Sequence, residues 1–95
     1  MSAKDIVAKL VRFEGRVQGV GFRYTANSLA RNFDVRGYVM NLSDGSVELY
    51  VEGSEEQVEQ FITAIRNEMA GYIRNCNIQS VTPTGKYKTF TVRFY

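Results

Sequence analysis

The chain turns at Gly15-Arg16-Val17-Gln18-Gly19-Val20-Gly21-Phe22-Arg23, a glycine-rich segment between a strand-like run and a helical pattern. The preceding run, Ile6 to Phe13, is apolar on both alternations, which is typical of a strand with neighbours on both sides. The following pattern predicts a helix that ends near Asn32–Asp34. Its apolar residues recur with the helical period and share one face that would pack on a sheet: Phe22, Ala26, Leu29, Ala30 and Phe33.

The glycine-rich segment has features of an anion-binding turn. Its three glycines lack a Cβ, so the backbone can curl and bring several N–H groups to one point. The first N–H groups of a helix have no internal partners and carry partial positive charge. Arg23, in the first helical turn, can reach the same anion with two parallel hydrogen bonds. The alternative is a strand–turn–helix junction without a ligand, with Arg23 as a solvated charge, because a lone glycine-rich motif is weak evidence.

The sequence after the first helix predicts one more helix and four more strands. Ser54 and Gln57 are spaced as a capping box, with Glu55 and Glu56 in the first turn of the helix that follows. The apolar stripe of that helix comprises Val58, Phe61, Ile62, Ile65 and Met69, and Gly71 ends it. The predicted strands are Val35–Asn41, Ser46–Glu52, Ile78–Thr82 and Lys88–Phe94, with turns at Ser43-Asp44-Gly45 and at Pro83–Lys86.

This order is β-α-β-β-α-β with one extra short strand. It predicts the α+β, ferredoxin-like split βαβ fold, in which two helices cover one face of an antiparallel sheet. With 95 residues and no linker or repeat, residues 1–95 are expected to form a single domain.

Composition excludes several classes of site. The chain has no histidine and one cysteine, Cys76, which excludes a Ser–His or Cys–His nucleophile, a zinc cluster and an internal disulfide. A lone cysteine fits a reducing, cytoplasmic setting, and Cys76 is most simply a packed small hydrophobe. No run of 18 apolar residues occurs, so no membrane association is expected. The net charge of +2 comes from scattered Lys and Arg, which disfavours nucleic acid but suits small anions.

Asn41 is the second candidate functional residue. If Ser43-Asp44-Gly45 forms the loop of a hairpin, Leu42 pairs with Ser46 and Asn41 pairs with Val47. Asn41 then lies at the rim of the sheet face that the helices cover, where its amide needs a partner. Two roles stay open from spacing alone, because a turn-capping Asn is as common as a functional one.

Two motifs together closely resemble the acylphosphatase family. The first is the glycine-rich segment that ends at Arg23. The second is Gly37-Tyr38-Val39-Met40-Asn41-Leu42-Ser43-Asp44-Gly45-Ser46-Val47-Glu48, and the closing Phe90-Thr91-Val92-Arg93-Phe94-Tyr95 is also similar to the family's last strand. The resemblance covers nearly the whole chain. Tyr38 departs from the pattern, since members often carry Trp there, but the change keeps an aromatic ring.

The resemblance implies hydrolysis of the carboxyl–phosphate bond of acyl phosphates to a carboxylate and inorganic phosphate. By motif position, Arg23 would bind the phosphate and Asn41 would orient the attacking water. Backbone amides would complete the cradle, from Gln18, Gly19, Val20, Gly21 and Phe22. The partners implied are a small acyl phosphate as substrate and inorganic phosphate as product inhibitor.

Chemistry and composition agree with this interpretation. Phosphoryl transfer needs positioning and charge stabilisation more than covalent help. A carboxylate leaving group needs no general acid, and the motifs lack the paired carboxylates that usually hold magnesium, so we expect neither metal nor cofactor. A monomer is expected by default. The acyl group that the enzyme prefers cannot be derived from the motifs, because they concern only the phosphate.

Two other functions remain possible on this fold, because fold alone does not determine function. An RNA-binding module would present stacking aromatics on the open sheet face. The third strand instead places Glu48 and Glu52 on that face, where they would repel phosphate. A binding or regulatory domain that retains the cradle without turnover is the closer alternative, although both key residues are present.

Overall fold

The computed structural model describes residues 5–94, which form seven regular elements. Their order is β1 (Ile6–Gly15), α1 (Phe22–Ala30), β2 (Val35–Asn41), β3 (Val47–Ser54), α2 (Glu55–Glu68), β4 (Ile73–Val81) and β5 (Phe90–Val92). The predicted β-α-β-β-α-β order is confirmed, and β5 is the extra short strand.

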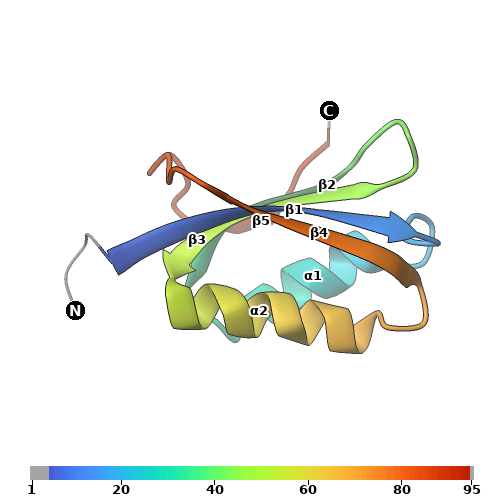
Figure 1. Ribbon diagram of the computed structural model, residues 1–95, viewed down its shortest axis with the longest axis horizontal. Helices are drawn as coiled ribbons and strands as arrows, with labels where there is room; N and C mark the ends of the chain where they lie inside the picture. Colours follow the sequence, from blue (N-terminus) through green and yellow to red (C-terminus); the bar gives the residue numbers. More distant parts are fainter. Residues whose placement is uncertain (1–4, 95) are drawn as a thin grey trace.

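The strands form a single sheet in the order β4-β1-β3-β2-β5. β3 pairs antiparallel with both β1 and β2, so the two strands that flank α1 run parallel with β3 between them. β5 pairs in parallel with β2 at the sheet edge. Figure 1 shows both helices on the same side of this sheet. The predicted ferredoxin-like split βαβ arrangement is therefore confirmed.

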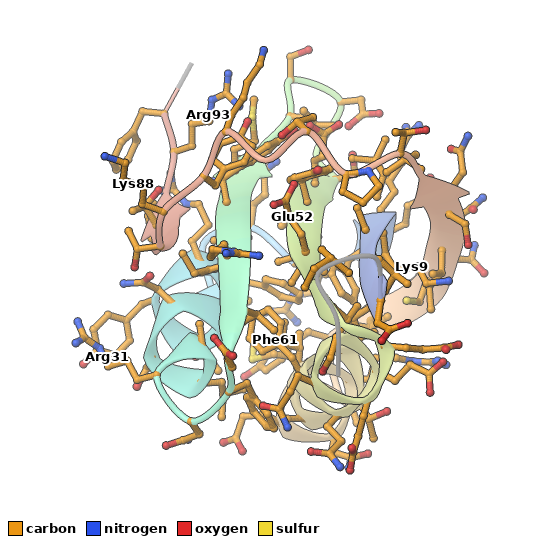
Figure 2. All side chains as sticks on the ribbon, turned by 90° about the vertical axis from the view of Figure 1, so that its left-hand side faces the viewer. Lys9, Arg31, Glu52, Phe61, Lys88 and Arg93 are labelled. Carbon is orange, nitrogen blue, oxygen red and sulfur yellow. The ribbon has the colours of Figure 1, made fainter. Side chains whose placement is uncertain are left out.

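The core lies between the sheet and the two helices. In β3, Val47, Leu49 and Val51 point to this side and are fully buried. Phe61 of α2 lies between the layers (Figure 2), with its ring centroid 5.1 Å from that of Phe90. The N-terminus of α2 is capped as expected, because Ser54 Oγ accepts a hydrogen bond from Gln57 N at 3.2 Å. Packing of apolar faces at the predicted helical and strand spacings thus builds the two layers.

Several element boundaries differ from the prediction. β4 begins at Ile73 rather than Ile78, because Asn75, Cys76 and Asn77 pair with β1 at the edge of the sheet, where a strand needs no continuous apolar pattern. β5 covers only three residues of the predicted Lys88–Phe94 strand. Hydrogen bonds from Gly37 N to Thr89 O and from Arg93 N to Val39 O continue its pairing on either side. The first helix ends at Ala30, earlier than expected.

The sheet face opposite the helices is partly covered. The expectation that Glu52 lies on an open face, where it would repel phosphate, is therefore wrong. The segment between β4 and β5 crosses this face, and Figure 2 shows Glu52 beneath it. Glu52 is 1% exposed, and its Oε2 accepts hydrogen bonds from Tyr50 Oη at 2.5 Å, Thr84 N at 3.0 Å and Gly85 N at 3.1 Å. Glu52 therefore holds the crossing segment and does not face solvent, so it contributes nothing to the argument against RNA.

The same hydrogen bonds make stability depend on pH. Burial would raise the pKa of Glu52, but the bonds from Tyr50, Gly85 and Thr84 outweigh it and hold the pKa below its ordinary value. As the pH falls, the unfolded chain takes up this proton first. The stabilisation is therefore complete above pH 4.5, the ordinary value, and is lost as the pH falls through the lower pKa of the folded state.

We expect Glu52→Gln to lower the free energy of unfolding at pH 7 by about 1–3 kcal/mol, because charge-assisted bonds to two backbone amides are weakened. The difference from the unaltered chain should shrink at pH 3. Urea unfolding at both pH values measures it, with Glu59→Gln on the exposed side of α2 as control. Equal stability of the Glu52→Gln and Glu59→Gln variants at pH 7 would show that Glu52 does not hold the crossing segment.

Candidate active site

The glycine-rich segment between β1 and α1 curls as its composition predicts. Gly19 and Gly21 adopt left-handed backbone angles, with φ of 77° and 80°, which other residues rarely adopt. A Cβ at either position would meet no atom within 4 Å, so glycine is required by conformation and not by crowding. The segment is anchored at both ends by buried side chains, Val17 and Phe22. The glycines therefore shape an exposed turn between two fixed points.

This turn presents a row of free backbone donors. Gly21 is the N-cap of α1 and has no side chain to cap it. The first helical hydrogen bond runs from Thr25 N to Gly21 O at 2.9 Å. Within residues 5–94, no amide from Gln18 to Tyr24 donates to a protein acceptor. These donors, together with the positive end of the helix dipole, are suited to an anion.

The side chain of Gln18 ties the turn to the β2–β3 hairpin. Its Nε2 donates to Leu42 O and to Ser46 O, both at 2.8 Å. Sequence reasoning included Gln18 only for its backbone amide and missed this link. No signal in the sequence could have revealed it, because both acceptors are backbone carbonyls far along the chain. Gln18 thus fixes the turn relative to Asn41, which directly precedes Leu42.

Asn41 has the position and register that the sequence predicts. It pairs with Val47, and the hairpin is closed by hydrogen bonds from Leu42 N to Ser46 O and from Gly45 N to Leu42 O. Its Oδ1 is buried and finds no hydrogen-bond partner in the described part of the chain. A buried amide oxygen without a partner is unusual in a folded protein and needs an explanation.

The turn of the hairpin is capped by Asp44 instead. Ser46 N donates to Asp44 Oδ1 at 2.9 Å, and Ser46 Oγ donates to the same oxygen at 2.5 Å. These bonds lower the pKa of the Asp44 carboxyl, because they favour its charged form. Since the turn is already capped, Asn41 is left available for another role.

One pocket of about 380 Å³ brings the two motifs together. Five predicted site residues line it: Gly19, Gly21, Phe22, Arg23 and Asn41. Gln18 and Val20 do not. Sequence reasoning missed the other five lining residues, which are Val17, Tyr24, Asn27, Val92 and Phe94.

The charge of Arg23 is available to a ligand in this pocket. Its guanidinium lies over the ring of Phe94, 4.8 Å from the ring centroid. Among the described residues no carboxylate pairs with it. No acidic residue of the described part of the chain lines the pocket, so Arg23 and the free amides give the pocket a positive character.

Another hollow is larger but unsuited to phosphate. It has a volume of about 740 Å³ and lies at the N-terminus of α2, beside Glu55, Glu56 and Glu59. These carboxylates interact favourably with the positive end of the α2 dipole, and they would repel an anion. No three His, Cys, Asp or Glu side chains within residues 5–94 are grouped so that they could hold a metal ion. Neither helix of this part of the chain is long and apolar enough to cross a membrane.

Comparison with known proteins identifies one family. Residues 9–92 match the family model described as Acylphosphatase. The acylphosphatase of Thermotoga maritima is 41% identical over 86 residues, which cover 90% of this chain and 94% of the relative. The crystal structure of acylphosphatase from Bacillus subtilis superposes with a TM-score of 0.82 at 27% identity, over 92% of this chain and 98% of that one. An acylphosphatase from Coxiella burnetii has the same TM-score and identity, over 98% and 100% of the two chains.

Proposed function

The chain belongs to the acylphosphatase family and hydrolyses acyl phosphates, and we propose that Arg23 and Asn41 are its catalytic residues. In this proposal Arg23 and the amides of residues 18–22 bind the phosphoryl group, and Asn41 orients the attacking water. The observation that carries it is that Arg23 and Asn41 line one pocket with Gly19 and Gly21 of the turn, and that the buried Oδ1 of Asn41 has no hydrogen-bond partner in the described part of the chain.

The phosphoryl group would lie at the N-terminus of α1. Its negative oxygens accept hydrogen bonds from the amides of the turn and from the guanidinium of Arg23. Because the donors are fixed by Gly19, Gly21 and the Gln18 link, they need no rearrangement as charge develops in the transition state. Preorganised donors of this kind supply much of the rate enhancement in phosphoryl transfer.

Asn41 would hold the nucleophile. Its Oδ1 can accept one hydrogen bond from a water, which leaves an oxygen lone pair directed at phosphorus. The water oxygen forms a bond to phosphorus while the bond to the acyl oxygen breaks, and the acyl group leaves as a carboxylate. The proton of the water passes to a phosphate oxygen of the substrate, which accounts for a site without histidine. The products are the carboxylate and inorganic phosphate.

The alternative of a binding domain without turnover is less well supported. Such a domain would need the donors of the turn and Arg23, but it would have no use for Asn41, which lines the same pocket and has a buried Oδ1 without a partner in the described residues. An unpaired buried oxygen costs stability, so a water-orienting role explains why the amide is there.

We expect hydrolysis of benzoyl phosphate to continue unchanged in excess EDTA and to be inhibited competitively by inorganic phosphate. The first result follows because amides and a guanidinium replace a metal ion as the charge-stabilising groups. The second follows because the product fits the same cradle. The absorbance change on hydrolysis measures both, with magnesium added back as control. Activity that EDTA removes and magnesium restores would contradict the proposal.

We also propose that residues 1–95 act as one domain, as a cytoplasmic monomer. In support of a single domain, the sheet and both helices share one core. Cys76, the single cysteine, packs half-buried against that core, and burial raises the pKa of its thiol, as expected for an unreactive cysteine.

A further inference from the structure

We propose that Tyr24 and Phe94 form a subsite for the acyl group, which favours flat aromatic acyl phosphates over small aliphatic ones. The proposal rests on the function proposed above, because it takes the phosphoryl group to lie at Arg23 and the turn. It assigns acyl-group binding to the part of the pocket for which the two motifs predict no role.

The first observation is the exposure of these two rings. Large apolar side chains are exposed at four positions among residues 5–94, and Tyr24 and Phe94 are the most exposed, at 78% and 71%. Both line the same pocket, whereas Ile78 and Tyr72 do not. Exposed aromatic side chains gathered at a concave site, next to a few polar groups, are typical of ligand binding.

The second observation is how close the rings lie to the phosphate-binding groups. Tyr24 directly follows Arg23 in the first turn of α1, and Phe94 lies against the Arg23 guanidinium. In an acyl phosphate only one oxygen separates the carbonyl carbon from phosphorus. When the phosphoryl oxygens contact Arg23, the acyl group therefore begins close to these two rings.

The third observation is the chemistry of the remaining wall. Val92 adds an apolar side chain and Asn27 a neutral amide, and among residues 5–94 no charged side chain other than Arg23 lines the pocket. Such a wall selects an uncharged acyl group. An aromatic acyl group can stack on Tyr24 or Phe94, or meet them edge to face, whereas an acetyl group offers one methyl.

The experiment compares benzoyl phosphate with acetyl phosphate as substrates of Tyr24→Ala and Phe94→Ala. We expect the ratio of their kcat/KM values to fall about three- to tenfold in each variant, the size of one aromatic contact. Phe94→Tyr, which keeps the ring, should keep the ratio. Ile78→Ala is the matched control, since it removes an exposed apolar side chain from β4, at the other edge of the sheet, and should leave the ratio unchanged.

The ratio separates this subsite from the phosphate cradle. Inhibition by inorganic phosphate, which has no acyl group, should stay within about twofold in Tyr24→Ala, because a single exposed ring is lost and no phosphate donor is touched. If the ratio stays unchanged in both alanine variants while phosphate still inhibits, the acyl subsite is wrong and the cradle stands. An equal loss on both substrates in Phe94→Ala would mean that this ring only holds Arg23, which would also overturn the assignment.

Discussion

Arg23→Gln is expected to reduce kcat/KM for benzoyl phosphate by at least about 10²–10³ and to abolish inhibition by inorganic phosphate. Among residues 5–94, Arg23 is the only charged side chain that lines the pocket, and no carboxylate pairs with it. Glutamine retains much of the side chain's length and one donor group, but it loses the charge and the second parallel hydrogen bond. Steady-state kinetics with phosphate as competitive inhibitor measures both effects.

Arg31→Gln is the matched control for that variant. Arg31 lies at the C-terminal end of the same helix (Figure 2), is exposed, and is absent from the pocket. The Arg31→Gln substitution removes one positive charge, as Arg23→Gln does, so any effect of net charge alone should appear in both variants. If Arg23→Gln keeps the phosphate inhibition constant of Arg31→Gln, Arg23 does not anchor the phosphate.

Local patterns were sufficient to predict the parts of the site that lie within one element or one turn. The register of Asn41 with Val47 follows from loop length and strand alternation, and both are local. The position of Arg23 in the first turn of α1 follows from the glycine-rich segment and the apolar helical stripe. These signals extend over no more than about 18 residues, the window in which periodicity carries information.

Features that depend on distant contacts could not be predicted in this way. Gln57 was expected to complete a capping box, but its side chain accepts a hydrogen bond from Asp34 N at 2.9 Å. Glu52 appeared to be a surface glutamate because the strand alternates, and only the segment that crosses from β4 to β5 buries it. Phe94 reaches the pocket because β5 pairs with β2 across the sheet, a pairing that no local pattern defines.

Asn41→Ala is expected to lower kcat by about 10² or more, while KM and phosphate inhibition change little. The amides of the turn and Arg23 remain in place, so binding is retained and the interaction with the attacking water is lost. The melting temperature should also change little, because no hydrogen bond of the Asn41 side chain is found in the described part of the chain.

Asp44→Ala, at the same hairpin, is expected to lower stability and to leave kcat nearly unchanged, which is the opposite of what we expect for Asn41→Ala. Asp44 caps the turn through Ser46, so its removal should cost about 1 kcal/mol of stability and leave kcat of the folded enzyme nearly intact. The two variants together distinguish a functional amide from a structural one, because each is expected to change only one of the two quantities.

The most direct test of the roles proposed for Arg23 and Asn41 is the phosphate inhibition constant of Asn41→Ala, measured beside its kcat and melting temperature on one sample. We predict a normal inhibition constant and a normal melting temperature with a kcat reduced by about 10² or more. A lower melting temperature with normal kcat per folded molecule would make Asn41 structural. The water-orienting role would then have to be abandoned.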